Sequence, residues 1–329
     1  MTETIGVLVM AYGTADGPDD IERYYTDIRG GRPPTPEHLE ELKGRYAAIG
    51  NVFPLMDITR RQAAGIERDL NATAPDGVRF VSYLGMKHSP PFIADGVARM
   101  REDGIERAVA IAMAPHWSGM SIETYIERVQ AEVAERGGPS FGFVRGFHDE
   151  PAFVALLADR VERAPASLTP EQRERATVVF SAHSLPVRTD ADGREWCKYC
   201  RVCQDACRYP IGLRQTADLV ADRLGLSTDA YTTGWQSAGR TADPWFGPGV
   251  EDVIRDLADA GRSAVVVCSA GFVADHLEIL YDLDIEAAGI AADAGIAFTR
   301  TQMPNDDPAF VAMLASVVRR ELSEMAGAG

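Results

Sequence analysis

Short apolar runs alternate with amphipathic stretches along the 329 residues of the chain. The runs are continuous and rich in β-branched residues, as expected of strands that are covered on both faces. Helix starts are also marked, because Thr35-Pro36 and Thr169-Pro170 each place a capping residue before a proline, and Gln172 completes a capping box. This alternation predicts an α/β fold with mainly parallel sheets. The eight expected strands are Ile5–Ala11, Arg79–Leu84, Ala108–Ala114, Ser140–Arg145, Thr177–Ala182, Ala230–Gly234, Ala264–Ser269 and Ile296–Thr299.

The expected strands fall into two sets of four, and the two sets resemble each other. Residues 149–158 (DEPAFVALLA) and 306–315 (DDPAFVAMLA) are nearly the same segment. We therefore expect a duplicated unit with domains 1–150 and 151–329, and a final helix able to pack back across the boundary. Ligands of open α/β sheets bind at the carboxyl ends of the strands. Tyr12 and His183 occupy equivalent positions there, so we expect them to face one cleft from opposite walls.

Charge and hydropathy exclude several classes of function. The net charge of −16 argues against a nucleic-acid partner. No stretch approaches eighteen apolar residues, so we expect no membrane span, and the N-terminus has no signal-peptide pattern. One cysteine cluster without scattered pairs fits a reducing compartment, so a cytoplasmic location is expected. A monomer is the simplest expectation for a duplicated protein with a cleft.

Four cysteines lie within eleven residues, at Cys197, Cys200, Cys203 and Cys207. An iron–sulfur cluster, a zinc site, a disulfide knot or simple reduced thiols could explain this run. The spacing favours an iron–sulfur cluster, because zinc sites usually split into two well-separated cysteine pairs. On spacing alone a [4Fe–4S] cluster is a candidate. The remaining cysteine, Cys268, lies in an expected strand and reads as a buried small apolar residue, although it could replace one ligand.

Two further elements carry candidate chemistry. His183 emerges at the ligand edge of its sheet, directly after a buried strand. Residues 271–286 read as a helix on which Glu278, Asp282 and Glu286 form a row at four-residue spacing. Such a row is most often a solvated face, but beside a histidine in a cleft it could carry a divalent cation such as Fe²⁺. Near the N-terminus, the side chains that could bind carboxylates are Arg29, Arg32, Arg45 and Tyr46.

Taken together, these residues resemble the ferrochelatase family, and most closely its water-soluble bacterial type that acts on coproporphyrin III. The resemblance covers nearly the whole chain. It rests on segments 10–14 (MAYGT), 20–25 (DIERYY), 45–50 (RYAAIG), 114–116 (APH), 181–186 (SAHSLP), 234–237 (GWQS), 243–245 (DPW) and 271–278 (GFVADHLE).

The resemblance implies two Rossmann-like (chelatase-type) domains and insertion of Fe²⁺ into a porphyrin in the cleft between them, as a step of haem biosynthesis. His183 and Glu278 would form the metal site, with Tyr12 as axial ligand on the opposite face and Asp282 and Glu286 on the iron path. The macrocycle and its propionates would contact Arg29, Arg45, Tyr46 and Tyr125. Phe53 stands where related soluble enzymes carry a serine, so one propionate hydrogen bond is in question.

Some ferrochelatases carry a [2Fe–2S] cluster, which the resemblance makes the first choice for the cysteine run. Transient contact with neighbouring enzymes of the haem pathway would also be expected. The residues leave other functions open: a protoporphyrin IX ferrochelatase, a chelatase for another tetrapyrrole or for a metal such as cobalt, a haem carrier without turnover, or an electron-transfer protein built around the cluster.

Overall fold

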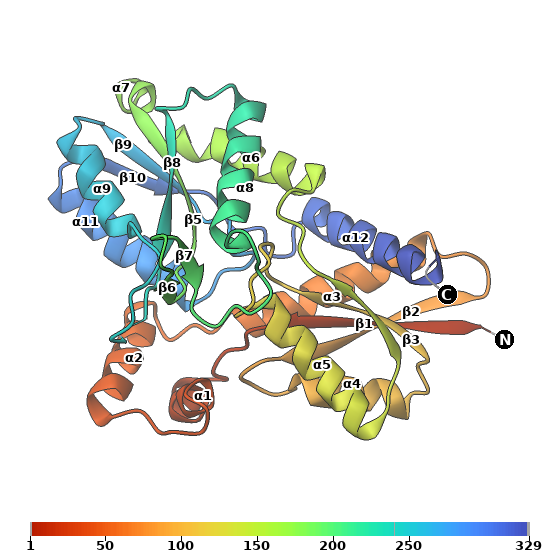
Figure 1. Ribbon diagram of the computed structural model, residues 1–329. Coiled ribbons are helices and arrows are strands. Elements are labelled where there is room, and N and C mark those ends of the chain that lie inside the picture. The colour runs from red at the N-terminus through yellow and green to blue at the C-terminus, as the bar shows by residue number, and fades with distance from the viewer. Residues whose placement is uncertain (1, 240, 328–329) are drawn as a thin grey trace.

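The computed structural model describes residues 2–239 and 241–327 and contains two four-stranded parallel sheets (Figure 1). The first sheet has the order β2-β1-β3-β4 and the second the order β10-β9-β5-β8. All eight expected strands are confirmed, each end lying within two residues of its expected position. Their bounds are β1 Glu3–Ala11, β2 Val78–Met86, β3 Arg107–Ala112, β4 Ser140–Val144, β5 Ala176–His183, β8 Tyr231–Gln236, β9 Ala264–Cys268 and β10 Ala297–Arg300.

The two sheets have the same internal order. If β1, β2, β3 and β4 are matched with β5, β8, β9 and β10, the first strand of each set lies between the second and the third, and the fourth is at an edge. This arrangement supports the duplicated unit expected from the two similar sequence segments. It also places Tyr12 and His183 at the carboxyl ends of equivalent inner strands.

Helices cover the sheets and follow the amphipathic stretches. Both expected helix starts are confirmed: the Thr35 hydroxyl accepts from the His38 N–H, and Thr169 and Gln172 form a reciprocal capping box. The helices are α1 Ile21–Ile28, α2 Pro36–Ala48, α3 Leu55–Ala72, α4 Ile93–Glu102, α5 Ile122–Arg136, α6 Pro151–Arg163, α7 Pro170–Glu174, α8 Arg208–Leu224, α9 Val250–Asp259, α10 Leu277–Leu280, α11 Ala288–Asp293 and α12 Pro308–Gly327, with 3₁₀ turns η1 Pro18–Asp20 and η2 Ala164–Ser167.

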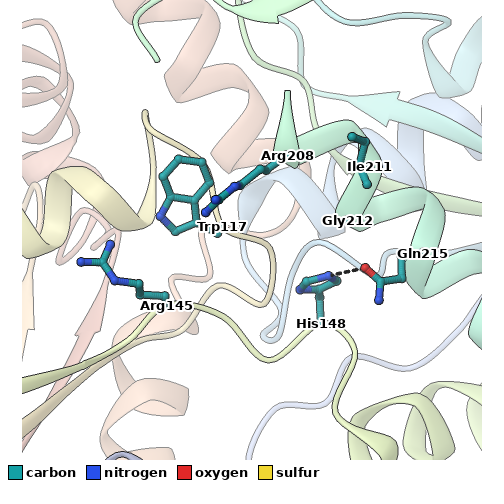
Figure 2. Close-up of a pocket in the computed structure, with 7 residues that line it drawn as sticks. All are labelled: Trp117, Arg145, His148, Arg208, Ile211, Gly212 and Gln215. Carbon is teal, nitrogen blue, oxygen red and sulfur yellow. Dashed lines mark hydrogen bonds between the residues drawn. The ribbon is translucent and has the colours of Figure 1, made fainter. Parts of the chain in front are cut away.

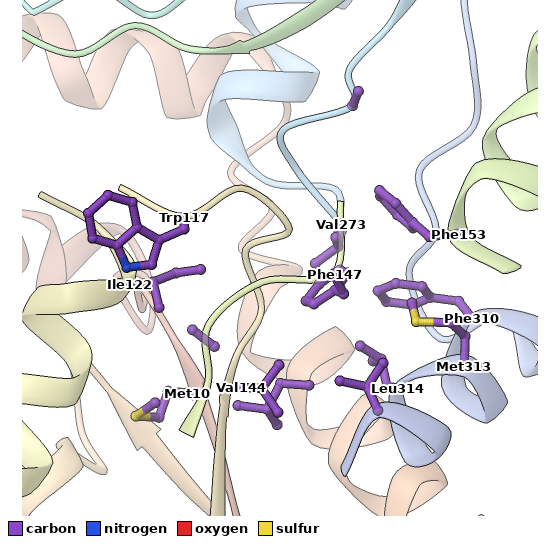
Figure 3. Close-up of a cluster of buried hydrophobic side chains, with 14 of the residues drawn as sticks. Met10, Trp117, Ile122, Val144, Phe147, Phe153, Val273, Phe310, Met313 and Leu314 are labelled. Carbon is purple, nitrogen blue, oxygen red and sulfur yellow. The ribbon is translucent and has the colours of Figure 1, made fainter. Parts of the chain in front are cut away.

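The last helix, α12, packs on the first sheet beside α3 (Figure 1). Its Glu321 carboxylate accepts from the Phe143 N–H of β4 at 2.9 Å. Around its start, Phe147, Phe153 and Phe310 form a ring cluster, with centroids 5.5 to 6.2 Å apart, inside a core that includes residues of both halves (Figure 3). The C-terminal segment therefore contributes to the packing of the N-terminal sheet.

One expected element is wrong in its extent. Residues 271–286 do not form one helix, because residues 271–276 form a turn and irregular backbone beside the end of β5. Gly271 donates its N–H to the Ser181 carbonyl at 2.9 Å, and a Cβ at Gly271 would lie 2.4 Å from that of Ala182. Regular helix begins at Leu277 and widens into the π-helical segment η3, Asp282–Ala287. Single π-turns inside helices are frequent at functional sites.

A short antiparallel hairpin, β6 (Val187–Thr189) and β7 (Glu195–Cys197), leads from β5 into the cysteine run and was not expected from the apolar pattern. Among the residues that the model describes, no helix has the length and apolar character needed to cross a membrane.

Candidate active site

His183 and Glu278 meet at the carboxyl end of the second sheet. His183 is the last residue of β5, and Glu278 lies in the first turn of α10. The His183 Nε2 atom is 3.6 Å from Glu278 Oε1, and His276 Nε2 is 3.5 Å from the other carboxylate oxygen. The His183 and Glu278 side chains retain 32% and 30% of their exposure. The pair is thus close enough to share one metal ion and open enough to receive it.

The pair is strongly polarised. Burial lowers the pKa of His183, but the Glu278 carboxylate outweighs it, so the net pKa is raised above 6.5. Burial raises the pKa of Glu278, but the opposing charges and hydrogen bonds of His183 and His276 hold it well below its usual range. Without a cation, this site therefore favours a protonated His183 beside an ionised Glu278.

Tyr12 immediately follows β1 and is 42% exposed. Its ring lies 4.6 Å from that of His88, whose Nδ1 is 2.7 Å from Asp27 Oδ1. Desolvation raises the pKa of the Tyr12 hydroxyl, and the negative charge of Glu278 raises it further. This electrostatic interaction connects the ends of the two inner strands, one from each sheet.

The carboxylate row is paired with a cation from the N-terminal half. Arg45 Nη2 lies 2.6 Å from Asp282 Oδ1 and 3.2 Å from Glu286 Oε2, and its guanidinium stacks 4.5 Å from the Tyr281 ring centroid. Asp282 is almost fully buried, and burial raises its pKa to about 6 although Arg45 opposes the shift. Arg45 is therefore the counter-ion of the row in this structure.

The other expected macrocycle contacts lie in different environments. Tyr46 is buried, its hydroxyl is 3.5 Å from Thr14 Oγ1, and its ring stacks on Phe53 at 4.5 Å. Tyr125 is buried in α5 beneath the Lys87 ammonium group, which is 5.3 Å from its ring centroid. Arg29 is exposed just beyond α1. The structure thus brings His183, Glu278, Asp282, Glu286 and Arg45 together. In the described part of the chain, Arg29 instead lies over the Tyr25 ring, 5.8 Å from its centroid.

Comparison with known proteins shows which family the chain belongs to. The family model described as ferrochelatase matches residues 4–322. The chain belongs to the ferrochelatase family. Among its relatives, the "Coproporphyrin III ferrochelatase" of Geobacillus sp. (strain WCH70) is 45% identical over 319 residues, which cover 97% of this chain and 98% of that relative. The enzyme of the same name from Bacillus subtilis (strain 168) has the same identity and coverage.

Solved structures show the same fold at much lower sequence identity. The structure described as "SirB from Bacillus subtilis with Fe3+" has a TM-score of 0.58 at 10% identity and covers 99% of this chain and 98% of that one. The fold is therefore shared with a protein whose sequence has little similarity to this chain.

Several residues around the ferrochelatase site were not identified as candidates from the sequence. The Gln236 side chain holds β8, β5 and the loop after β9 together, because its Oε1 accepts from the Ser181 and Ser269 hydroxyls, both at 2.6 Å. Ser237 has a positive φ of 58° and bonds Asp282 through its hydroxyl. A strained backbone at this point is a signal that no sequence pattern carries.

Lys87 is a third residue that the sequence did not indicate. Its ammonium group donates to the Thr124 hydroxyl at 2.8 Å, and Arg128 donates to its carbonyl oxygen. Burial, and then the charge of Arg128, lowers the pKa of Lys87 to about 8. Two cations therefore lie beside Tyr125, which is the chemistry a carboxylate-bearing ligand requires.

The cysteine run folds into two close thiol pairs. Cys197 Sγ is 3.2 Å from Cys207 Sγ, and Cys200 Sγ is 3.2 Å from Cys203 Sγ. In the described chain, no three His, Cys, Asp or Glu side chains gather around one point where a metal ion could bind. Cys268 lies in β9 and hydrogen-bonds Thr301, so its thiol is engaged within the second sheet.

Backbone donors surround these thiols. The N–H groups of Cys197 and Tyr209 hydrogen-bond to Cys207, and that of Arg208 hydrogen-bonds to Cys203. Hydrogen bonding from Cys197, against the effect of burial, lowers the pKa of Cys207 to about 6. Gly119, which lies between β3 and α5, packs against this loop, since a Cβ there would lie 3.0 Å from Cys200 Sγ.

A separate cavity of about 270 Å³ lies beside the first turns of α8 (Figure 2). It contains none of the candidate site residues, and His148 bonds Gln215 across it at 3.2 Å between Nε2 and Oε1. The cavity therefore lies between the two halves of the chain and is distinct from the metal site. Its walls are Trp117, Arg145, His148, Arg208, Ile211, Gly212 and Gln215.

Proposed function

We propose that this protein inserts Fe²⁺ into coproporphyrin III to give iron coproporphyrin III. The observation that carries the proposal is the His183–Glu278 pair, 3.6 Å apart, whose carboxylate also acts electrostatically on Tyr12. The names of the relatives, which match over nearly their full length, support the same substrate. Imidazole and carboxylate are both ligands of Fe²⁺, and the phenol offers a ligand on the other face of a macrocycle.

His183 would serve as the proton acceptor as well as a metal ligand. Two pyrrole N–H protons must leave the porphyrin as iron enters, and only a neutral imidazole can take one. In the free site Glu278 raises the pKa of His183 and so favours the charged form. A divalent cation bound at Glu278 opposes that effect, because its positive charge repels the imidazolium proton. Iron arrival and deprotonation of His183 are thereby coupled.

The row behind Glu278 would deliver the iron. Asp282 and Glu286 are proposed as the path, with Ser237 fixing the Asp282 carboxylate. Arg45 pairs with the carboxylates of Asp282 and Glu286 while no metal ion is bound, so their negative charge is compensated.

The porphyrin itself is proposed to contact Tyr46, Tyr125, Phe53 and the arginines at 29 and 45. Lys87 and Arg128 add positive charge beside Tyr125, where a four-carboxylate substrate gains more than a two-carboxylate one.

The test compares His183→Ala with the wild type under anaerobic conditions. We expect the variant to lose iron insertion while its coproporphyrin affinity, measured by fluorescence quenching, changes by less than about threefold. The exposed His38→Ala serves as the matched control and should retain activity. Normal insertion by His183→Ala would overturn the assignment. Faster metallation of protoporphyrin IX by the wild type would replace the substrate but keep the enzyme class.

We also propose that the cysteine run binds a [2Fe–2S] cluster. Each iron of such a cluster takes two thiolates, and the four thiols already form two pairs. A [4Fe–4S] cluster, with one thiolate on each iron, fits this pairing less well. N–H donors around the sulfurs suit a negatively charged group. When bound, the cluster would supply a one-electron redox centre and a cross-link of the loop. The chain's own part is to hold Cys197 and Cys200 buried and Cys203 partly exposed.

Anaerobic purification tests this second proposal. We expect visible absorption and about two irons per chain by metal analysis. The absorption should be lost in Cys200→Ser but retained in Cys268→Ser, which removes the thiol in β9. A colourless protein containing zinc, or colour lost equally in both variants, would contradict the proposal.

A further inference from the structure

The cysteine run and the metal-site histidine are joined by two short connections. The run begins at Cys197, which pairs with Val187 in the β6–β7 hairpin, only four residues after His183. It ends at Cys207, the N-cap residue of α8. The thiols of these two residues lie 3.2 Å apart, so both ends of the run come together next to the segment that leaves His183.

Tyr209 makes the second connection. It is the second residue of α8 and is buried. Its hydroxyl donates to the His183 carbonyl oxygen at 2.8 Å. Its ring lies 5.4 Å from that of Trp235, which fixes the tyrosine against β8. Tyr209 therefore spans from the last cysteine of the run to the backbone of the metal-site residue.

Other bonds hold the same turn from different sides. Ser184 donates its N–H to the Gln236 carbonyl at 2.7 Å, and Lys198 donates to the Pro186 carbonyl at 2.8 Å. Lys198 itself lies in the cysteine run, directly after Cys197. The turn after His183 is thus fixed by β8 on one side and by both ends of the cysteine run on the other.

We propose that Tyr209 is a positioning residue for iron insertion, which ties the His183 backbone to the cysteine run so that order in the run sets the geometry of the His183–Glu278 pair. The inference rests on the proposed function, but it adds a residue outside the proposed iron and porphyrin contacts. A metal site must hold its ligands within a fraction of an ångström, and a hydrogen bond to the ligand's own backbone provides that precision.

Tyr209→Phe removes the hydroxyl and keeps the ring. We expect kcat for iron insertion to fall roughly fivefold, the effect of one lost hydrogen bond, while KM for coproporphyrin changes less than twofold. Tyr231→Phe is the matched control, because Tyr231 is also buried and its hydroxyl donates to Asp218 on the same helix at 2.7 Å. The control should leave both constants unchanged.

Hydrogen exchange provides a readout that needs no turnover. In Tyr209→Phe the amides of residues 183–185 and of Val187 should exchange faster than in the wild type, and in Tyr231→Phe they should not. Unchanged kcat and exchange in Tyr209→Phe, or equal losses in the control, would overturn the inference. A wild type that inserts no iron would instead overturn the proposed function, and exchange would still test the connection.

A double-variant cycle tests the link to the cysteines. Cys207→Ser should lower kcat in the wild-type background and have less than half that effect, on a logarithmic scale, when Tyr209 is already Phe. Fully additive effects would show that the run does not act through Tyr209. Coproporphyrin binding by each variant verifies that it is folded.

Discussion

Burial of the Asp282 carboxylate destabilises the folded protein near neutral pH, so a substitution at this residue leads to a quantitative prediction. Burial raises its pKa from 3.8 to about 6 even though Arg45 lies 2.6 Å away. A carboxyl group with a raised folded-state pKa weakens the folded state progressively as pH rises between the two pKa values. Two pKa units correspond to about 3 kcal/mol at neutral pH. Asp282→Asn removes this titration and keeps nearly the same shape.

We therefore expect the stability of Asp282→Asn, relative to the wild type, to increase with pH. The pI is about 4.8, so the useful range begins near pH 5. Between about pH 5 and pH 8, roughly half of the total, about 1.5 kcal/mol, should appear. Urea unfolding at several pH values measures it, and groups common to both proteins cancel in the difference. A stability difference that stays constant, or falls, across this range would refute the reasoning. The same variant should use Fe²⁺ less well if Asp282 lies on the iron path.

Three further predictions concern the site. Glu278 raises the pKa of His183, so the neutral imidazole that accepts the proton is lost as pH falls. We therefore expect kcat/KM to rise with pH, with an apparent pKa above 6.5. A kcat/KM that declines with pH in this region would contradict the prediction. Glu286→Ala should raise KM for Fe²⁺ severalfold with little effect on KM for coproporphyrin, and equal changes in both would count against the path. Phe53→Ser should lower the free energy of unfolding by roughly 1 kcal/mol, measured in urea, because the ring stacking on Tyr46 is lost. The same variant should lower KM for coproporphyrin, and an unchanged KM would show that no propionate reaches this position.

The sheets were predictable because their signal is local. A buried parallel strand such as β9 consists of consecutive apolar residues, and its pattern is visible without its neighbours. The hairpin β6–β7 was missed because strands of three residues, with Arg188 and Thr189 exposed, have no apolar run. The π-turn at Asp282 was missed for a related reason, since four-residue spacing looks the same in either kind of helix.

The site residues that belong to family motifs were predictable, whereas contacts between segments far apart in the sequence were not. Resemblance indicated His183 and Glu278 as partners, and their 3.6 Å separation fits that prediction. The pairing of Arg45 with Asp282 joins residues 237 positions apart, and periodicity carries no information about it. The hydrogen bond from Tyr209 to His183 could not be predicted from the sequence either, because a tyrosine at the start of a helix usually has only a packing role.

The most direct measurement mixes Fe²⁺ and coproporphyrin III with the anaerobic protein and follows the porphyrin absorption bands, with a protein-free control and with His183→Ala. The account predicts that the wild type shifts the bands to those of the iron complex much faster than the control, and that the variant does not. Bands that change no faster with the wild-type protein than without it would contradict the account.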